Sequence, residues 1–121
     1  MDEKLRIVMV EPGKQAYFTE IPNTLEAEQQ AVGGGPFDIV YLDDGILVCN
    51  DEGKLRGMEG NRRLDNGSII AGTFFIVGDG GEDFRSLTDA EAIHFLQRFA
   101  QPEQISQREV QADMGFTFMC F

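Results

Sequence analysis

The sequence has no tryptophan, one histidine and two cysteines among its 121 residues. Nucleophilic catalysis needs a base beside the nucleophile, and His94 has no recognisable serine or cysteine partner. Cys49 and Cys120 lie in apolar segments without CxxC or zinc-type spacing, so we expect two buried thiols, and nothing in the pattern supports a disulfide. The many carboxylates contain no distinguishable pair for glycoside chemistry, and no indole is present to stack on a sugar ring.

Long apolar runs are missing as well. The longest, "IIAGTFFIV", is far shorter than the ~20 residues that span a bilayer. The first residues, "MDEKLRIVMV", lack the basic start and the cleavage site of a signal peptide. We therefore expect a cytoplasmic protein that does not engage a membrane.

Basic residues are scarce: 10 lysines and arginines face 21 acids, which gives a net charge of −11. Such a field repels nucleic acid, so direct nucleic-acid binding is not expected. Two interpretations of the acids stay open. They keep the protein soluble, or they imitate the phosphates of DNA and so occupy a DNA-binding protein.

The chain has the length of one domain, and its apolar runs predict strands. These runs are 4–10, 15–21, 37–42, 46–50 and 68–78. The last is apolar on both faces, so we expect it at the centre of the sheet. Asp43-Asp44-Gly45 and Asn66-Gly67 predict tight turns, because glycine tolerates a positive φ.

Two helices are predicted from capping patterns. Asn23 with Glu26 starts a short helix that Gly33 ends, and Thr88 with Glu91 starts a second one. Leu25 and Val32 are expected to face the core from the first helix. The second helix should present an apolar face and leave His94 partly exposed; the face comprises Ala92, Ile93, Leu96, Phe99 and Ala100.

Together these elements predict one α+β domain over residues 1–101, with a mostly antiparallel sheet of five to seven strands and two packed helices. Residues 102–121 form a tail. Its first part, "EQISQREVQAD", is polar and weakly helical at best, whereas "MGFTFMCF" is apolar and β-prone and would aggregate if exposed. We expect the tail to add a final strand to the sheet, with a swapped or homodimeric contact as the alternative.

The loop "GDGGEDFR", residues 78–85, is the first candidate site. Its glycines are typical of phosphate-binding loops, but Asp79, Glu82 and Asp83 oppose an anion and no Walker lysine follows. The same carboxylates could hold calcium, yet the EF-hand spacing is absent. We expect an acidic turn, shaped by a pair between Arg85 and Asp79 or Asp83, that contacts a partner; no metal or cofactor is predicted.

The second candidate is the basic segment 54–64, "KLRGMEGNRRL". Neighbouring acids predict that most of its charge is neutralised locally. Asn61-Arg62 is the polar pair selected from it as a contact for a partner or ligand, because it is expected in a loop without an evident structural role.

Four segments together resemble a family of small proteins defined only as a domain of unknown function. They are "VEPGK", "NTLEAEQQAVGG", "ILVCNDEGKLRGMEGNRRL" and "IIAGTFFIVGDGGEDFRSLTDAE", and the resemblance covers roughly residues 5–99. Members of this family occur in phages, plasmids and conjugative elements of gut Gram-positive bacteria and typically end soon after the second helix. The family pattern falls on Glu11, Pro12, Gly13, Leu25, Val32, Gly33, Gly34, Asn50, Gly53, Asn61, Arg62, Gly72, Thr73 and Gly78.

The resemblance implies a mobile-element context and brings no catalytic residue. Because no complete catalytic constellation is visible, we expect a non-enzymatic, acidic protein-interaction module, with an anti-defence accessory as its specific form. The alternative is a small ligand- or metal-binding domain that uses the acidic loop 78–85.

Overall fold

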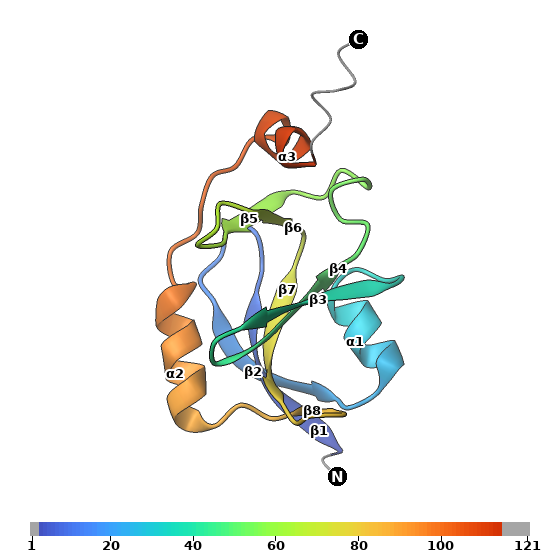
Figure 1. Ribbon diagram of the computed structural model, residues 1–121, viewed down its shortest axis with the longest axis vertical. Coiled ribbons are helices and arrows are strands. Elements are labelled where there is room, and N and C mark those ends of the chain that lie inside the picture. Colours follow the sequence, from blue (N-terminus) through green and yellow to red (C-terminus); the bar gives the residue numbers. More distant parts are fainter. Residues whose placement is uncertain (1–2, 115–121) are drawn as a thin grey trace.

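The computed structural model describes residues 3–114, and its main sheet is antiparallel and six-stranded. Five strands lie in the order β2 (Tyr17–Pro22), β1 (Lys4–Val10), β7 (Phe74–Asp79), β4 (Gly45–Asn50) and β3 (Phe37–Leu42), and the short β8 (Phe84–Arg85) pairs with β7 (Figure 1). A separate hairpin joins β5 (Gly60–Arg63) to β6 (Ile69–Ala71). The predicted α+β class is confirmed.

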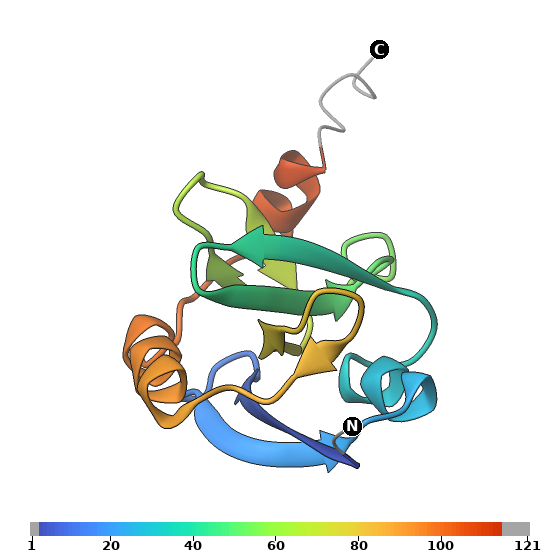
Figure 2. The same cartoon turned by 60° about the horizontal axis from the view of Figure 1, so that its bottom comes forward.

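Both faces of the sheet are covered, because side chains alternate along its central strands. On one face, Val8, Leu47 and Ile76 pack with Phe95 of α2 (Asp89–Arg98). The opposite face, which includes Phe75, packs with Val32 at the end of α1 (Leu25–Ala31). Figures 1 and 2 show the two helices on opposite sides of the sheet.

The predicted strand 68–78 is divided in two. Gly72 has φ of +83° and breaks the run, so that β6 belongs to the small hairpin and only β7 enters the main sheet. β7 is the central strand, as predicted for this apolar run. A Cβ atom at Gly72 would lie 2.6 Å from Sδ of Met58, so a larger residue does not fit at this corner.

The first helix begins one residue later than predicted. Thr24, and not Asn23, is its N-cap, and Oγ1 of Thr24 accepts a hydrogen bond from N–H of Ala27. Leu25 and Val32 are seven residues apart, almost two helical turns, but Leu25 is the first residue of the helix and Val32 is its C-cap. Leu25 is 62% exposed, contrary to the prediction, while Val32 is buried as expected.

The capping box of Thr88 and Glu91 is confirmed at the start of α2. His94 is exposed, as predicted, and Ala92, Leu96 and Phe99 of the predicted apolar face pack in the core. Ile93 is 55% exposed, whereas Phe95 is completely buried and packs with Phe99.

Both predicted tight turns form. Asn66-Gly67 joins β5 to β6, and Gly67 has the expected positive φ of +88°. Asp43-Asp44 joins β3 to β4, but Gly45 does not have a positive φ. Glycine is needed there for space, because a Cβ atom would lie 3.1 Å from the ring of Phe95.

A third helix, α3 (Gln107–Asp113), follows α2 and was not predicted. Ser106 and Glu109 form a capping box at its start, which the polar composition of the segment concealed. Val110 is buried against Ile69 and Ala71, so this segment lies on the small hairpin. Residues 115–121, where the final strand or dimer contact is predicted, lie outside the described residues.

Gly60 tests how α3 is held. A Cβ atom there would lie 2.7 Å from Cβ of Ile105 and 3.0 Å from Cγ2 of Val110. We expect Gly60→Ala to lower the free energy of unfolding by about 1–3 kcal/mol, because overpacking displaces the segment. Urea denaturation measures this change.

The control is Ile105→Ala alone and combined with Gly60→Ala. Ile105→Ala removes Cγ2 of Ile105, which would lie 2.8 Å from the added Cβ atom, but keeps Cβ at 2.7 Å, so it relieves part of the overlap. The double variant should therefore be more stable than the sum of the two single changes predicts. Strict additivity would contradict the proposed contact.

Candidate functional site

Asn61 lies in β5 rather than in a loop, and none of its surface is exposed. Its Nδ2 donates hydrogen bonds of 2.9 Å to the carbonyl oxygens of Val10 and Gly72. Asn61 thus joins the end of β1 to the corner between β6 and β7. These hydrogen bonds give Asn61 a structural role, which was not predicted from the sequence.

Arg62 is also buried, with 1% of its surface exposed. Its Nη2 donates to the carbonyl oxygens of Lys14 at 2.5 Å and Phe99 at 2.9 Å, and Nη1 donates to Oδ1 of Asn61 at 2.8 Å. Phe99 is the C-cap of α2, where carbonyl oxygens carry partial negative charge. The guanidinium therefore links the β1–β2 turn, β5 and the end of α2.

No carboxylate in the described chain forms an ion pair with Arg62, and its Nε is buried without a partner. Burial lowers the pKa of the guanidinium from its ordinary value. Carbonyl and amide oxygens accept its hydrogen bonds, and the carboxylate of Glu103 favours its charged form without forming an ion pair. Because Asn61 and Arg62 are buried, we do not propose this pair again as a contact for a partner.

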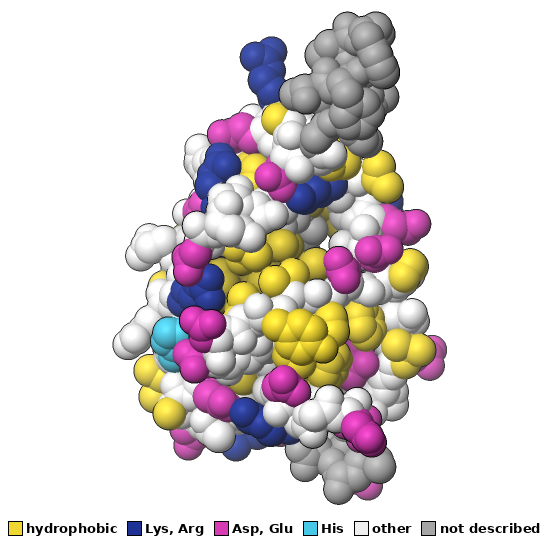
Figure 3. Space-filling model, in the orientation of Figure 1, with side chains coloured by type: hydrophobic (Ala, Val, Ile, Leu, Met, Phe, Trp, Pro, Cys, Tyr) yellow, Lys and Arg dark blue, Asp and Glu magenta, His cyan; other side chains and the backbone are white. Residues whose placement is uncertain are grey.

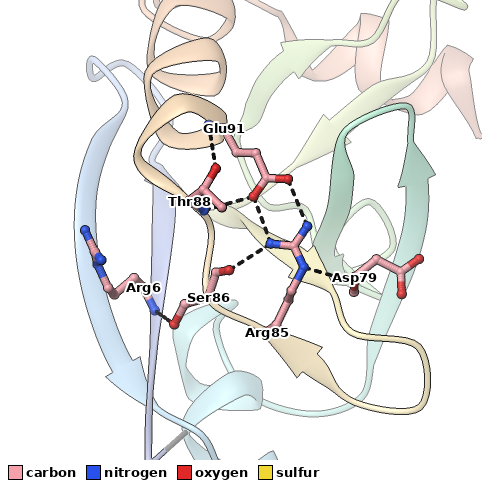
Figure 4. Close-up of polar contacts among 6 residues, drawn as sticks. All are labelled: Arg6, Asp79, Arg85, Ser86, Thr88 and Glu91. Atoms are coloured by element: carbon pink, nitrogen blue, oxygen red, sulfur yellow. Dashed lines mark hydrogen bonds and ion pairs between the residues drawn. The ribbon is translucent and has the colours of Figure 1, made fainter.

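Arg85 lies at the centre of the polar contacts in Figure 4. Its Nη1 and Nη2 each donate 2.8 Å hydrogen bonds to the carboxylate of Glu91, in the first turn of α2. The predicted pair with the Asp79 or Asp83 carboxylate is wrong, because Nε of Arg85 donates to the backbone oxygen of Asp79. A Cβ atom at Gly78 would lie 2.7 Å from Cγ of Arg85, which explains the glycine there.

The pair with Arg85 changes the acidity of Glu91. Hydrogen bonds from Arg85, and then from the backbone N–H of Thr88, lower the pKa of Glu91 to about 2. The carboxylate thus serves two purposes: it caps α2 and it holds the strand that leads into the helix. Arg6 adds to this connection, because its backbone N–H donates to Oγ of Ser86 at 2.9 Å (Figure 4).

The carboxylates of the acidic loop lie on the surface. Oδ1 of Asp79 accepts a hydrogen bond from N–H of Gly81, while Glu82 and Asp83 are exposed. No group of three or more histidine, cysteine or acidic residues in the described part of the chain is arranged to hold a metal ion. The loop is an exposed acidic turn that Arg85 anchors to α2.

The other basic residues of segment 54–64 are engaged within the domain. Lys54 pairs with Asp113 of α3, and Nη2 of Arg63 lies 2.8 Å from Oε1 of Glu109. Nη1 of Arg56 donates to the carbonyl oxygen of Gly34. The charge is neutralised within the domain, but the acids that form ion pairs, Asp113 and Glu109, are distant in sequence and are not the neighbouring acids that were predicted.

A groove of about 450 Å³ lies between β3, β4 and β6. Its apolar lining includes Val40, Leu55, Ile70 and Met114; two carboxylates, Asp38 and Asp51, also line it. Figure 3 shows apolar side chains gathered in the middle of this side of the molecule. The groove could not be predicted from the sequence, because its wall is formed by separate segments between residues 38 and 114.

Acidic side chains on the side shown in Figure 3 are dispersed among basic and apolar ones and form no unbroken row. This side therefore does not reproduce the regular charge ladder of DNA.

Cys49 and His94, the other candidate catalytic residues, are not arranged as a nucleophile and its base. Cys49 is buried, which raises the pKa of its thiol to about 11, and Nε2 of the exposed His94 lies 3.7 Å from a carboxylate oxygen of Asp44.

The chain belongs to the family described as a domain of unknown function, DUF3846, whose model matches residues 5–100. Neither the curated proteins nor the solved structures contain a match to it. None of the described helices is long and apolar enough to cross a membrane. Helix α3 and the groove residue Met114 lie beyond the matched region.

Arg62 and its neighbour Arg63 form a matched pair for mutagenesis. We expect Arg62→Met to lower the free energy of unfolding by more than about 3 kcal/mol, because three acceptors, two of them buried, lose their donors at about 1–3 kcal/mol each. Arg63→Met removes an exposed ion pair and should change stability much less. Urea denaturation of both variants makes the comparison, and equal losses would contradict the assigned role.

Glu91 should make stability depend on pH. Its pKa in the folded state is below the ordinary value of 4.5, so its ionised form stabilises the fold above about pH 4.5, and this contribution is lost as the pH falls toward 2. We expect Glu91→Gln to be less stable by about 1–2 kcal/mol at pH 7, a value reduced for the partly exposed Arg85. Denaturant titrations between pH 7 and pH 2.5 should show that the difference in the free energy of unfolding between the wild type and Glu91→Gln becomes smaller as the pH falls. A difference that stays constant would contradict the assigned role of Glu91.

Proposed function

We propose that this protein is a non-enzymatic interaction module that binds a protein partner at the groove beside β3. The groove, apolar within and lined by carboxylates, is the observation that supports this function best. Its volume falls in the range of recognition pockets, and apolar surface gives binding its driving force.

The position of β3 favours a partner that adds a strand. β3 ends the strand order of the main sheet, and β4 is its neighbour on the inner side. A strand added to its outer edge would lie about 4.8 Å away, and alternate side chains would project on the same face as Asp38 and Val40. Val40 and Asp38 are both in the groove wall, so these side chains would enter the groove.

Charge favours a basic partner. Asp38 and Asp51 form no ion pair with a described residue, whereas Lys54, the cation of the groove wall, is paired with Asp113. The groove therefore keeps unpaired negative charge, and the chain as a whole carries −11. Both attract a cationic protein and accelerate its association.

The biological form of the proposal is an accessory protein of a mobile element, acting against a host defence protein. Many defence proteins act on nucleic acid and so carry basic surfaces, to which an acidic module is complementary. The resemblance implies the mobile-element context, and the charge supports the class of target. As part of the same proposal, we place the protein in the cytoplasm, where it would meet such a target.

The tail is the competing occupant of the groove. Met114 is part of the groove wall, so residues 115–121 follow directly from it. In this second form of the proposal, the tail adds to β3 of its own chain or of a second copy, which would give a homodimer. Deletion of residues 115–121 separates the two forms.

Leu55 and Ile93 provide the test of the partner. Both are exposed, at 70% and 55%, but only Leu55 lines the groove. With a tagged chain expressed in its host, a stoichiometric partner should be recovered with wild type and with Ile93→Lys. Recovery should fall at least tenfold with Leu55→Lys, because a lysine brings positive charge into the groove that receives the cationic partner.

The same capture with a chain shortened to residue 114 completes the experiment. An unchanged yield assigns the groove to the partner, while a wild-type dimer that the deletion abolishes assigns it to the tail. Capture that is equal in wild type and Leu55→Lys would contradict binding at the groove.

A further inference from the structure

Glu28 is the only buried acid in the described part of the chain, with 7% of its surface exposed. Its carboxylate forms no hydrogen bond or ion pair with a described residue. Buried polar groups are nearly always partnered, and an unpaired buried charge opposes folding. Burial accordingly raises the pKa of Glu28, since the ionised form loses part of its hydration and gains no ion pair.

Glu28 forms part of the wall of a hollow of about 300 Å³ between α1 and the acidic loop. Glu82 and Asp83 contribute two exposed carboxylates to the same wall. The hollow thus combines one buried and two exposed acids, and no basic side chain lines it.

The remaining wall is largely apolar and aromatic. The rings of Phe37 and Phe84 lie with their centroids 6.3 Å apart, and Leu25 completes this side. A bare divalent ion needs six or more oxygen ligands at about 2.5 Å, and these acids are not grouped closely enough to hold a metal. Aromatic rings beside carboxylates suit an organic cation, whose charge meets the acids while its alkyl chain contacts the rings.

We propose that this hollow binds the ammonium or guanidinium end of an alkyl cation, with Glu28 as its buried counter-ion. A lysine or arginine side chain and a free alkylamine share this chemistry. The site lies on α1 and the loop 78–85, whereas the groove is built from other segments, so this inference stands apart from the proposed function.

The site implies a conflict between stability and binding. Without a cation, ionised Glu28 destabilises the fold, so Glu28→Gln should raise the melting temperature at pH 7. The difference in melting temperature between Glu28→Gln and the wild type should disappear as the pH falls below about 4.5, where the carboxyl of Glu28 is protonated in both the folded and the unfolded state. Glu82 and Asp83, the titratable groups that line the hollow with Glu28, are present in both the wild type and Glu28→Gln, so their titration does not account for the difference between the two proteins.

Thermal unfolding at pH 7 with n-butylammonium and n-butylguanidinium chloride tests the binding, with sodium chloride at equal ionic strength as the reference. Both organic cations should raise the melting temperature of the wild type beyond the sodium reference. Glu28→Gln should weaken the apparent affinity at least tenfold. Glu26→Gln, an exposed acid of the same helix, is the matched control and should respond as the wild type does.

A second arm distinguishes the two sources of the cation. A short acetylated peptide with one central lysine should bind more tightly than butylammonium if the hollow receives a side chain of a protein, and no more tightly if it receives a free amine. The proposal is overturned if wild type shows no shift beyond sodium chloride, or if Glu28→Gln shifts equally.

Discussion

The buried guanidinium of Arg62 is the contact on which the arrangement of this domain depends. It donates to the β1–β2 turn at Lys14, to the end of α2 at Phe99 and to Asn61, which in turn holds β1 and the corner at Gly72. These segments lie far apart in sequence. Its hydrogen bonds go to carbonyl and amide oxygens and not to a carboxylate, so the contact is directional and requires every acceptor to be in place. The small hairpin and α2 are thereby fixed relative to the sheet.

Each surface feature is built on this framework. The hairpin that Arg62 holds carries β6, one wall of the groove, and the same hairpin receives α3 through Val110. On the other side of the sheet, Arg85 anchors the acidic loop to Glu91, which places the loop beside α1 and so forms the hollow around Glu28. Within residues 3–114, this strongly acidic chain thus buries one cation, Arg62, whose contacts hold the fold together, and one acid, Glu28, that forms no ion pair.

The sequence predicted the elements well where the signal is local. Alternation and apolar runs located β1, β2, β3, β4 and β7, but not the short strands β5 and β8, and the capping box at Thr88 located α2. Two predictions failed: Gly72, with its positive φ, interrupts the run 68–78, and Leu25, the first residue of α1, is exposed. The structural role of Arg62 could not be predicted, because two of its acceptors are backbone oxygens of residues distant in sequence. The groove and the hollow could not be predicted either, because segments distant in sequence form their walls.

The most direct test of the central role of Arg62 is nuclear magnetic resonance of the arginine side chains. Hydrogen bonds from both Nη atoms restrict rotation of the Arg62 guanidinium, and its burial keeps water away from the N–H groups. The account predicts separate Nη–H signals for Arg62 that exchange slowly with solvent, while those of the exposed Arg63 are averaged and exchange rapidly. Averaged, rapidly exchanging signals from Arg62 would contradict it.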